Sequence, residues 1–315
     1  FVKKLRGNMT KVHICAFNAD EYKQSLDPLF PGIRISIGRS YNDLGEGVDD
    51  CEVLIAFGPI LNDRVFQRNK KLKWVQSLGT GVDGIFDQPN LSPEIPITSM
   101  RGIHGPQMSE LAFLLMLALN RNFPKILDNQ KQHSWDRWPG LILEHKSIGI
   151  WGVGTVAGAL AKRCKAFDMK VIGFTRTARE VQYFDQILDL KNVLWAIGQL
   201  DYLVVLAPYT PENEGIVNSS VFSEMKESAF IINLARGKVV DDKALIQALK
   251  NGEIAGAGLD VFTKEPLPSS SPLWDLDNVI ITPHMGGMSE SYVRQAMPVL
   301  EHNLKAYLEN DYGRM

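Results

Sequence analysis

Three residues in the second half of the chain have side chains that together support proton transfer to a polarised carbonyl group. They are Arg236 in the segment NLARG, Glu265 before a proline, and His284 in the segment TPHMGG. A histidine exchanges a proton near neutral pH, and a neighbouring glutamate fixes its tautomer and raises its pKa. An arginine binds a carboxylate and polarises a carbonyl. Each residue also has a plain structural reading: a surface arginine, a Glu-Pro turn, or a structural histidine at a strand end.

Short apolar runs precede these three residues and predict how they are positioned. The runs at 230–233, 256–260 and 279–282 have the composition of β-strands, with turns and helix-like segments between them. Strands that alternate with helices form parallel sheets, whose strands all present their carboxyl ends at one edge. Ligands bind at that edge. The sequence therefore predicts that the arginine, glutamate and histidine come together there.

A glycine-rich turn joins the strand at 147–151 to a helix-forming segment, in the pattern Gly-x-Gly-x-x-Ala. Gly152 allows a sharp turn, Gly154 lets the backbone approach a pyrophosphate, and Ala157 lets the helix pack close to the sheet. The free N–H groups at the start of that helix would face the phosphates. The pattern favours dinucleotide binding, and a structural turn without a ligand is the alternative.

The same alternation of strands and helices runs through the whole chain. Six strands are expected in the second half, the number in a complete doubly wound dinucleotide domain, at 147–151, 170–174, 202–206, 230–233, 256–260 and 279–282. Five more, in the first hundred residues, indicate a smaller α/β domain, at 12–17, 33–37, 53–57, 73–76 and 97–98. A length of 315 residues also favours two domains. The predicted class is α/β, with a doubly wound parallel sheet of the Rossmann type.

The residue that ends the second strand of such a domain decides which dinucleotide is accepted. An acidic residue there binds the ribose 2′-hydroxyl of NAD. Here the strand at 170–174 is followed by Thr175, Arg176 and, shortly after, Arg179, with no acid. A guanidinium group pairs with a 2′-phosphate, so we predict that NADP is preferred and that NAD is possible. The alternative is that both arginines are solvated surface charges.

A second glycine-rich loop, SLGTGVDG at 77–84, follows the fourth strand of the smaller domain. Closely spaced glycines leave backbone N–H groups open to an anion such as a carboxylate. A flexible surface loop is an equal alternative at this point.

The segment at 106–119 is expected to be a helix, because it is rich in leucine, alanine and methionine. It is apolar nearly all round, so it must be buried on several faces. We predict that it contributes to a subunit interface as well as to packing within the chain. The following stretch contains Trp135 and Trp138, which either reach over a ligand or are buried by their own loop.

Composition excludes several classes of partner. A formal charge of −2 gives no basis for binding nucleic acid or an anionic membrane, and the longest apolar run is too short to span a bilayer. The three cysteines have neither metal-binding nor redox spacing, so no metal is expected, and they suggest the reducing cytoplasm.

Taken together, the motifs resemble those of the D-isomer-specific 2-hydroxyacid dehydrogenases. The resemblance covers the chain from Lys11 onward and is carried by the glycine turn at 152–154, LARG at 234–237, DVF at 260–262 before the Glu-Pro pair, and TPH at 282–284 before two glycines. It implies a cofactor domain at 101–287, inserted into a flavodoxin-like substrate domain formed by 1–100 and 288–315. It also implies a homodimer.

The resemblance also implies a role for each matching residue. Arg236 would bind the substrate carboxylate and carbonyl, His284 would be the general acid, and Glu265 would keep it protonated. The backbone amides of Thr80 and Gly81 would receive the substrate carboxylate. The implied cofactor contacts are Gly152, Gly154, Thr155, Val156, Thr175, Arg176, Arg179, Pro208, Ala235, Asp260 at the nicotinamide carboxamide, and Gly287.

The function expected from the residues and the resemblance is an NAD(P)-dependent oxidoreductase. It would transfer a hydride between NADP(H) and a small 2-oxo or D-2-hydroxy acid, with glyoxylate or hydroxypyruvate as the expected substrate. Two alternatives stay open: a D-lactate- or mandelate-type dehydrogenase, and a non-catalytic cofactor-sensing scaffold. A panel of 2-oxo acids separates these three.

Overall fold

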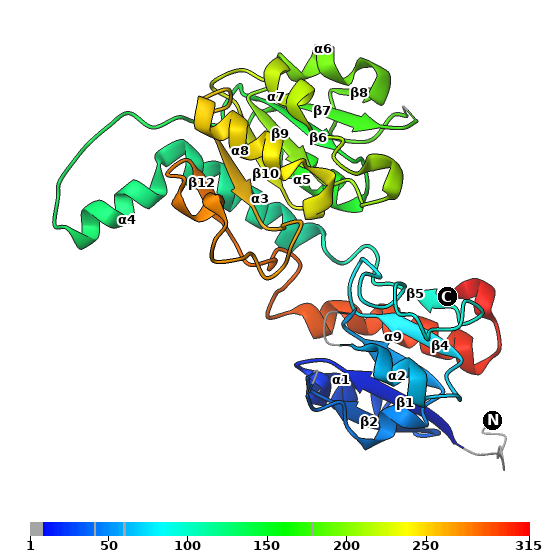
Figure 1. The fold of residues 1–315 in the computed structure, drawn as a ribbon. Coiled ribbons are helices and arrows are strands. Elements are labelled where there is room, and N and C mark those ends of the chain that lie inside the picture. The colour runs from blue at the N-terminus through cyan, green and yellow to red at the C-terminus, as the bar shows by residue number, and fades with distance from the viewer. Residues whose placement is uncertain (1–8, 41, 59–60, 178) are drawn as a thin grey trace. The chain divides into compact units, whose positions relative to one another are not determined.

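The computed structural model describes residues 9–40, 42–58, 61–177 and 179–315 (Figure 1). The chain divides into two compact units. The smaller unit contains the chain up to Ile103 and again from Ser289 onward, and the larger unit contains His104–Met288. The sequence predicts the two boundaries after residues 100 and 287.

The smaller unit is built on a parallel sheet of five strands in the order β2-β1-β3-β4-β5. This order is that of a flavodoxin-like fold. The strands are β1 (Thr10–Cys15), β2 (Ile33–Gly38), β3 (Val53–Ala56), β4 (Trp74–Ser77) and β5 (Ile97–Thr98). Buried side chains alternate between the two faces of the central strands, so each face needs its own cover.

Helices cover both faces of this sheet. On one face, α1 (Ala19–Leu26) and α9 (Tyr292–Leu308) pack over Val12, Ile14 and the indole of Trp74. On the other face, α2 (Asp63–Arg68) packs over Leu54. The C-terminal helix therefore completes the core of the unit formed by the N-terminal hundred residues.

The larger unit contains a parallel sheet of seven strands in the order β12-β11-β10-β9-β6-β7-β8. The strands are β6 (Ser147–Trp151), β7 (Lys170–Thr175), β8 (Gln186–Asp189), β9 (Tyr202–Val205), β10 (Phe230–Asn233), β11 (Gly256–Leu259) and β12 (Val279–Ile281). The chain runs outward from β6 to β8 and then crosses to β9 on the other side of β6. The strand order therefore reverses beside β6, where a doubly wound sheet binds its ligand.

The prediction of six strands in this unit was wrong by one. Strand β8 pairs with β7 at the sheet edge and is only partly buried. An edge strand that begins with Gln186 and ends with Asp189 has no continuous apolar run, so its pattern resembles that of a loop.

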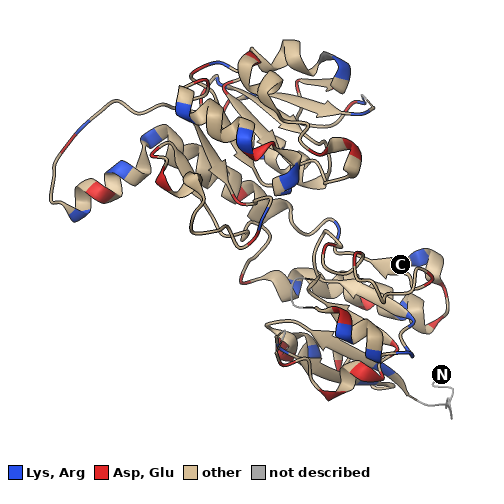
Figure 2. Cartoon of the chain, viewed as in Figure 1, with Lys and Arg blue, Asp and Glu red and all other residues tan. Residues whose placement is uncertain are grey.

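Two groups of helices cover this second sheet (Figure 1). On one face, α3 (Gly105–Arg121) and α5 (Thr155–Ala166) pack over Ile148, Ile150 and Val204. On the other face lie α6 (Val193–Ile197), α7 (Ser219–Glu224) and α8 (Asp242–Asn251). Figure 2 shows charges of both signs scattered over the helices and loops of both units.

The helix α4 (Phe123–Lys131) and the segment after it extend away from the sheet of the larger unit (Figure 1). None of the residues of α4 is buried. Trp135 is 88% exposed, which contradicts the alternative that this loop buries it. Among the described residues, no helix is long and apolar enough to cross a membrane.

Candidate active site

The glycine turn follows β6 and connects directly to α5. Gly152 has φ +104°, and a Cβ atom there would lie 2.6 Å from the backbone nitrogen of Ala207, so only glycine fits without strain. A Cβ at Gly154 would meet nothing within 4 Å. Gly154 is the N-cap of α5, and the buried Ala157 packs that helix onto the sheet. The turn thus presents a helix N-terminus with open space in front of it.

The strand register brings the predicted cofactor contacts to the same edge as this turn. Trp151, the last residue of β6, pairs with Phe174 of β7 and with Val205 of β9. The segments that follow these strands therefore begin side by side. The predicted cofactor residues at or just beyond this edge of the larger sheet are Gly152, Gly154, Thr155, Val156, Thr175, Arg176, Arg179, Pro208, Ala235, Asp260 and Gly287.

The two arginines after β7 differ in what they contact. The Nη2 atom of Arg179 donates a hydrogen bond to the carbonyl oxygen of Val153, at 2.9 Å, and so ties this segment to the glycine turn. Arg176 is exposed one residue beyond the half-buried Thr175. A guanidinium group therefore stands at the end of β7, where NAD-binding domains of this type have an acid.

The structure brings His284 and Glu265 into direct contact. The Nδ1 atom of His284 lies 2.6 Å from Oε2 of Glu265, and Oε1 accepts a hydrogen bond from the Phe262 amide at 2.9 Å. Burial raises the pKa of the Glu265 carboxyl, but the bonds from His284 and Phe262 outweigh it. The positive charge of Arg236 acts in the same direction, so the pKa lies below the usual value.

The loop of Arg236 packs tightly against the loop of Glu265, close enough for the charge of Arg236 to act on that carboxyl. A Cβ at Gly237 would lie 1.8 Å from the carbonyl carbon of Phe262, so the close approach of the two loops requires glycine. The buried Asn233 secures the turn: its Oδ1 accepts from the Ala235 amide, and its Nδ2 donates to the Arg236 carbonyl. The three residues expected to act together are therefore neighbours in one unit.

The backbone at His284 has φ +51°, a conformation that costs energy in a residue with a side chain. Asp260 holds this turn in place. Its carboxylate accepts from the Thr282 hydroxyl at 2.6 Å, from the Met285 amide at 3.0 Å and from the Gly286 amide at 2.9 Å. Its carbonyl accepts from the His284 amide at 2.8 Å.

Asp260 is 1% exposed, and three donors from its own chain occupy its carboxylate. A carboxylate offers about four acceptor positions. The carboxylate of Asp260 can therefore accept one further hydrogen bond. The predicted contact with the nicotinamide carboxamide requires one such position.

Sequence reasoning did not assign His104, which belongs to the same site. It precedes α3 and is 7% exposed. Burial lowers its pKa, and the charge of Arg236 lowers it further, so the imidazole is neutral at pH 7. A Cβ at Gly287 would lie 3.3 Å from its ring, which places it against the turn after His284. No motif marks this histidine, and only the packing of α3 reveals it.

The predicted carboxylate-binding loop lies in the smaller unit, directly after β4. Thr80 is exposed at its tip and Gly81 is half-buried. Ser77, the last residue of β4, is buried beneath them. The loop thus occupies the carboxyl edge of its own sheet, the edge at which α/β sheets bind ligands.

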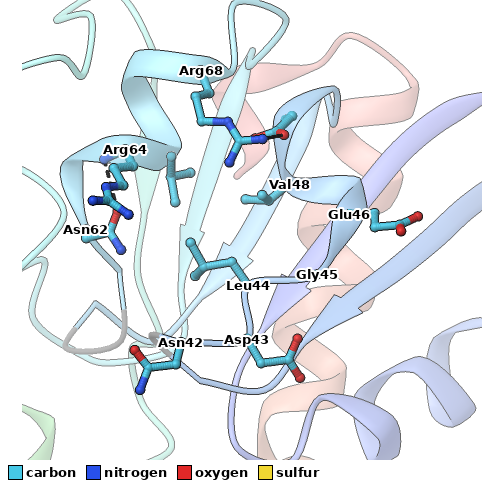
Figure 3. A pocket seen from close by; sticks show the side chains of 11 residues that line it. Asn42, Asp43, Leu44, Gly45, Glu46, Val48, Asn62, Arg64 and Arg68 are labelled. Carbon is cyan, nitrogen blue, oxygen red and sulfur yellow. Dashed lines mark hydrogen bonds and ion pairs between the residues drawn. The ribbon is translucent and has the colours of Figure 1, made fainter.

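A separate cavity of about 540 Å³ lies in the smaller unit, between α2 and the loop after β2 (Figure 3). Arg64, Arg68 and Asn62 lie on one side of it, and Leu44 and Val48 on the other. None of the predicted site residues lines this cavity. Within the described ranges, no cluster of histidine, cysteine and acidic side chains could hold a metal ion.

The chain is similar to known proteins of one family. The model of the D-isomer specific 2-hydroxyacid dehydrogenase NAD binding domain matches residues 113–286. The chain is 34% identical to the glyoxylate reductase of Pyrococcus horikoshii over 256 residues, 78% of this chain and 76% of that one. It is 32% identical to the D-3-phosphoglycerate dehydrogenase of Methanocaldococcus jannaschii over 89% of this chain.

The alignment with the latter covers 54% of its length, so the chain spans about half of the phosphoglycerate dehydrogenases that it matches. Among solved structures, it resembles the NADPH-dependent glyoxylate/hydroxypyruvate reductase of Sinorhizobium meliloti, determined with NADP and sulfate. The TM-score is 0.82 at 27% identity, over 96% of both chains. By its matching domain, its relatives and its fold, the chain belongs to the D-isomer-specific 2-hydroxyacid dehydrogenase family.

Proposed function

We propose that the protein reduces small 2-oxo acids to D-2-hydroxy acids, with glyoxylate or hydroxypyruvate as substrate and NADPH as the preferred reductant. The 2.6 Å contact between His284 and Glu265 carries this proposal. A histidine held by a carboxylate, with an arginine beside the pair, forms a proton donor next to a carboxylate-binding group. The names of relatives that reduce glyoxylate support the choice of substrate.

The larger unit fits a bound dinucleotide. Space is open in front of Gly154, and the first N–H groups of α5 point toward it. Thr155 and Val156 would hold the pyrophosphate, and Pro208 would line the adenosine side. Asp260 would hold the carboxamide, with Ala235 and Gly287 as further contacts. When bound, the dinucleotide supplies the hydride that reduces the carbonyl carbon.

Preference for NADP is supported by the residues after β7. Thr175 carries no charge, and Arg176 adds a positive one where a 2′-phosphate would lie. An acid there would repel the phosphate, whereas a guanidinium group pairs with it. Arg179 is held against the glycine turn and adds a second positive charge nearby. A structure of a similar protein from Xanthobacter autotrophicus contains NADPH.

The protein's own residues then perform proton transfer and orientation. Because Nδ1 of His284 faces Glu265, the ring presents Nε2 to the substrate, and Nε2–H protonates the carbonyl oxygen during reduction. The carboxylate of Glu265 stabilises the imidazolium before transfer. Arg236 binds the substrate carboxylate and polarises the carbonyl, and the amides of Thr80 and Gly81 receive the carboxylate. Asp260 keeps the histidine in its strained turn.

The proposed enzyme is a homodimer in the cytoplasm. The apolar side chains of Leu114, Phe123 and Leu127 on α3 and α4 are about half exposed in the single chain, which supports a covering subunit. All three cysteines are free and buried, as is common in a reducing compartment.

The test is a panel of 2-oxo acids assayed with NADPH and with NADH. The panel contains glyoxylate, hydroxypyruvate, pyruvate, phenylglyoxylate and phosphohydroxypyruvate. We expect the highest kcat/KM for glyoxylate or hydroxypyruvate with NADPH. His284→Ala should lower kcat by about 10²–10⁴-fold while NADPH still binds. A preference for pyruvate or phenylglyoxylate would favour a lactate- or mandelate-type enzyme. NADPH binding without turnover of any acid would favour a cofactor sensor.

A further inference from the structure

Most carbonyl groups in and just before the loop that follows β4 accept hydrogen bonds from other parts of the smaller unit. The Ser77 carbonyl accepts from the side-chain amide of Gln76 at 2.8 Å. The Gly79 carbonyl accepts from the Met100 amide at 3.0 Å. The Leu78 carbonyl accepts from the phenol of Tyr292, and the Gly81 carbonyl from the hydroxyl of Ser77 at 2.9 Å.

Ser77 is the centre of this arrangement. Its side chain is buried, and its Oγ atom accepts from the Gly79 amide at 3.1 Å while it donates to the Gly81 carbonyl. One hydroxyl therefore joins the first and last parts of the loop. Without it, the half-buried N–H group of Gly79 and the carbonyl of Gly81 would both lose this partner, which is costly.

Tyr292 holds the same loop from the C-terminal helix. It is the first residue of α9 and donates to the Leu78 carbonyl across 214 positions of sequence. Burial raises the pKa of the Tyr292 phenol, so it keeps its proton and acts as a donor at any physiological pH.

The direction of these carbonyls decides the direction of the amides. In a trans peptide, the carbonyl of one residue and the N–H of the next point to opposite sides. The Gly79 carbonyl points to Met100, so the Thr80 N–H points the other way. The Gly81 carbonyl points to Ser77, so the Val82 N–H is likewise directed away from the core. An anchored loop of this kind is preorganised for an anion.

We infer that Ser77 and Tyr292 are positioning residues of the substrate site, which hold the 78–82 loop with the Thr80 and Val82 amides directed at the substrate carboxylate. This inference rests on the proposed function. Neither side chain touches the substrate, and both act through the loop backbone. Their contribution is therefore to affinity for the acid, and the proton transfer at His284 does not depend on them.

The experiment compares Ser77→Ala and Tyr292→Phe with the unaltered enzyme, using glyoxylate and NADPH. Binding of oxalate, a dicarboxylate that cannot be reduced in this reaction, is measured by calorimetry on the enzyme–NADPH complex. We expect KM for glyoxylate and Kd for oxalate to rise about tenfold in Ser77→Ala and less in Tyr292→Phe. The KM for NADPH and the kcat should change less than about threefold, because a uniform binding interaction was removed.

Ser36→Ala is the matched control. Ser36 lies on β2, and its hydroxyl contacts the His13 ring at 2.9 Å. In the strand order, β2 is three places from β4, so Ser36 is distant from the loop after β4. This variant should leave the KM for glyoxylate and the Kd for oxalate unchanged. Unchanged oxalate and glyoxylate constants in both Ser77→Ala and Tyr292→Phe would overturn the inference while the proposed function stands. An unaltered enzyme that neither reduces a 2-oxo acid nor binds oxalate would refute the proposed function itself.

Discussion

At the scale of single residues, one carboxylate connects the candidate acid to the rest of the site. Glu265 accepts from the ring of His284 and from the Phe262 amide, and the charge of Arg236 acts on it as well. All of these interactions favour its ionised form. The same carboxyl therefore contributes to stability and, in the proposed mechanism, to orienting the imidazole.

The lowered pKa of Glu265 predicts how stability changes in acid. A carboxyl whose pKa is depressed on folding stabilises the protein fully above its unfolded value, here 4.5, and this contribution is lost as the pH falls through the folded value. Glu265→Gln should therefore be less stable than the unaltered protein at pH 7, and the difference should shrink below pH 4.5. Urea unfolding at pH 7 and pH 4 measures it.

The same substitution at Glu301 provides the comparison. That side chain pairs with Lys305 on the surface of α9. Exposed pairs of this kind contribute little, so the variant should behave like the unaltered protein at both pH values. A stability difference for Glu265→Gln that stays constant down to pH 4 would contradict the assignment.

At the scale of elements, the site depends on how the loops after β11 and β12 are joined. Asp260 follows β11, and its carboxylate accepts from three residues of the loop after β12. These bonds stabilise the left-handed backbone of His284, which would otherwise relax to a less strained form. The geometry of the candidate site therefore depends on two paired strands.

Thr282→Val tests this connection without altering any charge. The substitution keeps the shape of the side chain but removes the 2.6 Å bond to Asp260. A hydrogen bond to a charged group contributes about 1.5–3 kcal/mol, so unfolding should require correspondingly less free energy. The kcat should fall because the turn at His284 loosens, while the KM for NADPH stays nearly constant.

Thr10→Val, on β1 of the other unit, controls for the general effect of this replacement. If Asp260 only bound the nicotinamide carboxamide and did not hold the turn at His284, Thr282→Val would leave kcat unchanged. An unchanged kcat together with reduced stability would therefore show that the bond is merely structural.

At the scale of the whole molecule, the larger unit exposes apolar side chains that a single chain does not cover. Leu114 is 57% exposed on α3, and Phe123 and Leu127 on α4 are 44% and 42% exposed. The other faces of α3 pack on α5 and the sheet, as expected for a helix that is apolar nearly all round. The exposed faces of α3 and α4 are the proposed dimer interface.

Leu117→Asp should weaken the dimer and leave the fold of each chain intact. Leu117 is 39% exposed on α3, so a charge there is solvated in the monomer but buried and unpaired in the proposed interface. Light scattering coupled to gel filtration should show a dimer for the unaltered protein and a monomer for the variant. Leu308→Asp on α9, equally exposed at 39%, should remain dimeric. A monomeric unaltered protein would contradict the proposed assembly.

The sequence by itself determined the features that depend on neighbouring residues. The glycine turn, the strands that it follows, and the arginine, glutamate and histidine at strand ends all depend on local patterns. Parallel strands gather their carboxyl ends, so local patterns were enough to place Arg236, Glu265 and His284 at one edge. The edge strand β8 was missed because its partial burial leaves no apolar run.

Only the tertiary structure decided the contacts between distant segments. Tyr292 reaches the Leu78 carbonyl over 214 positions, and Asn303 of α9 reaches Gln76 over 227. His104 lies beside Arg236 because α3 packs where it does. Such contacts arise from the order in which strands and helices pack, and no spacing within the sequence encodes them. Arg236, Glu265 and His284 can therefore be predicted from the sequence. The side chains that contact their surroundings from distant segments can be identified only from the tertiary structure.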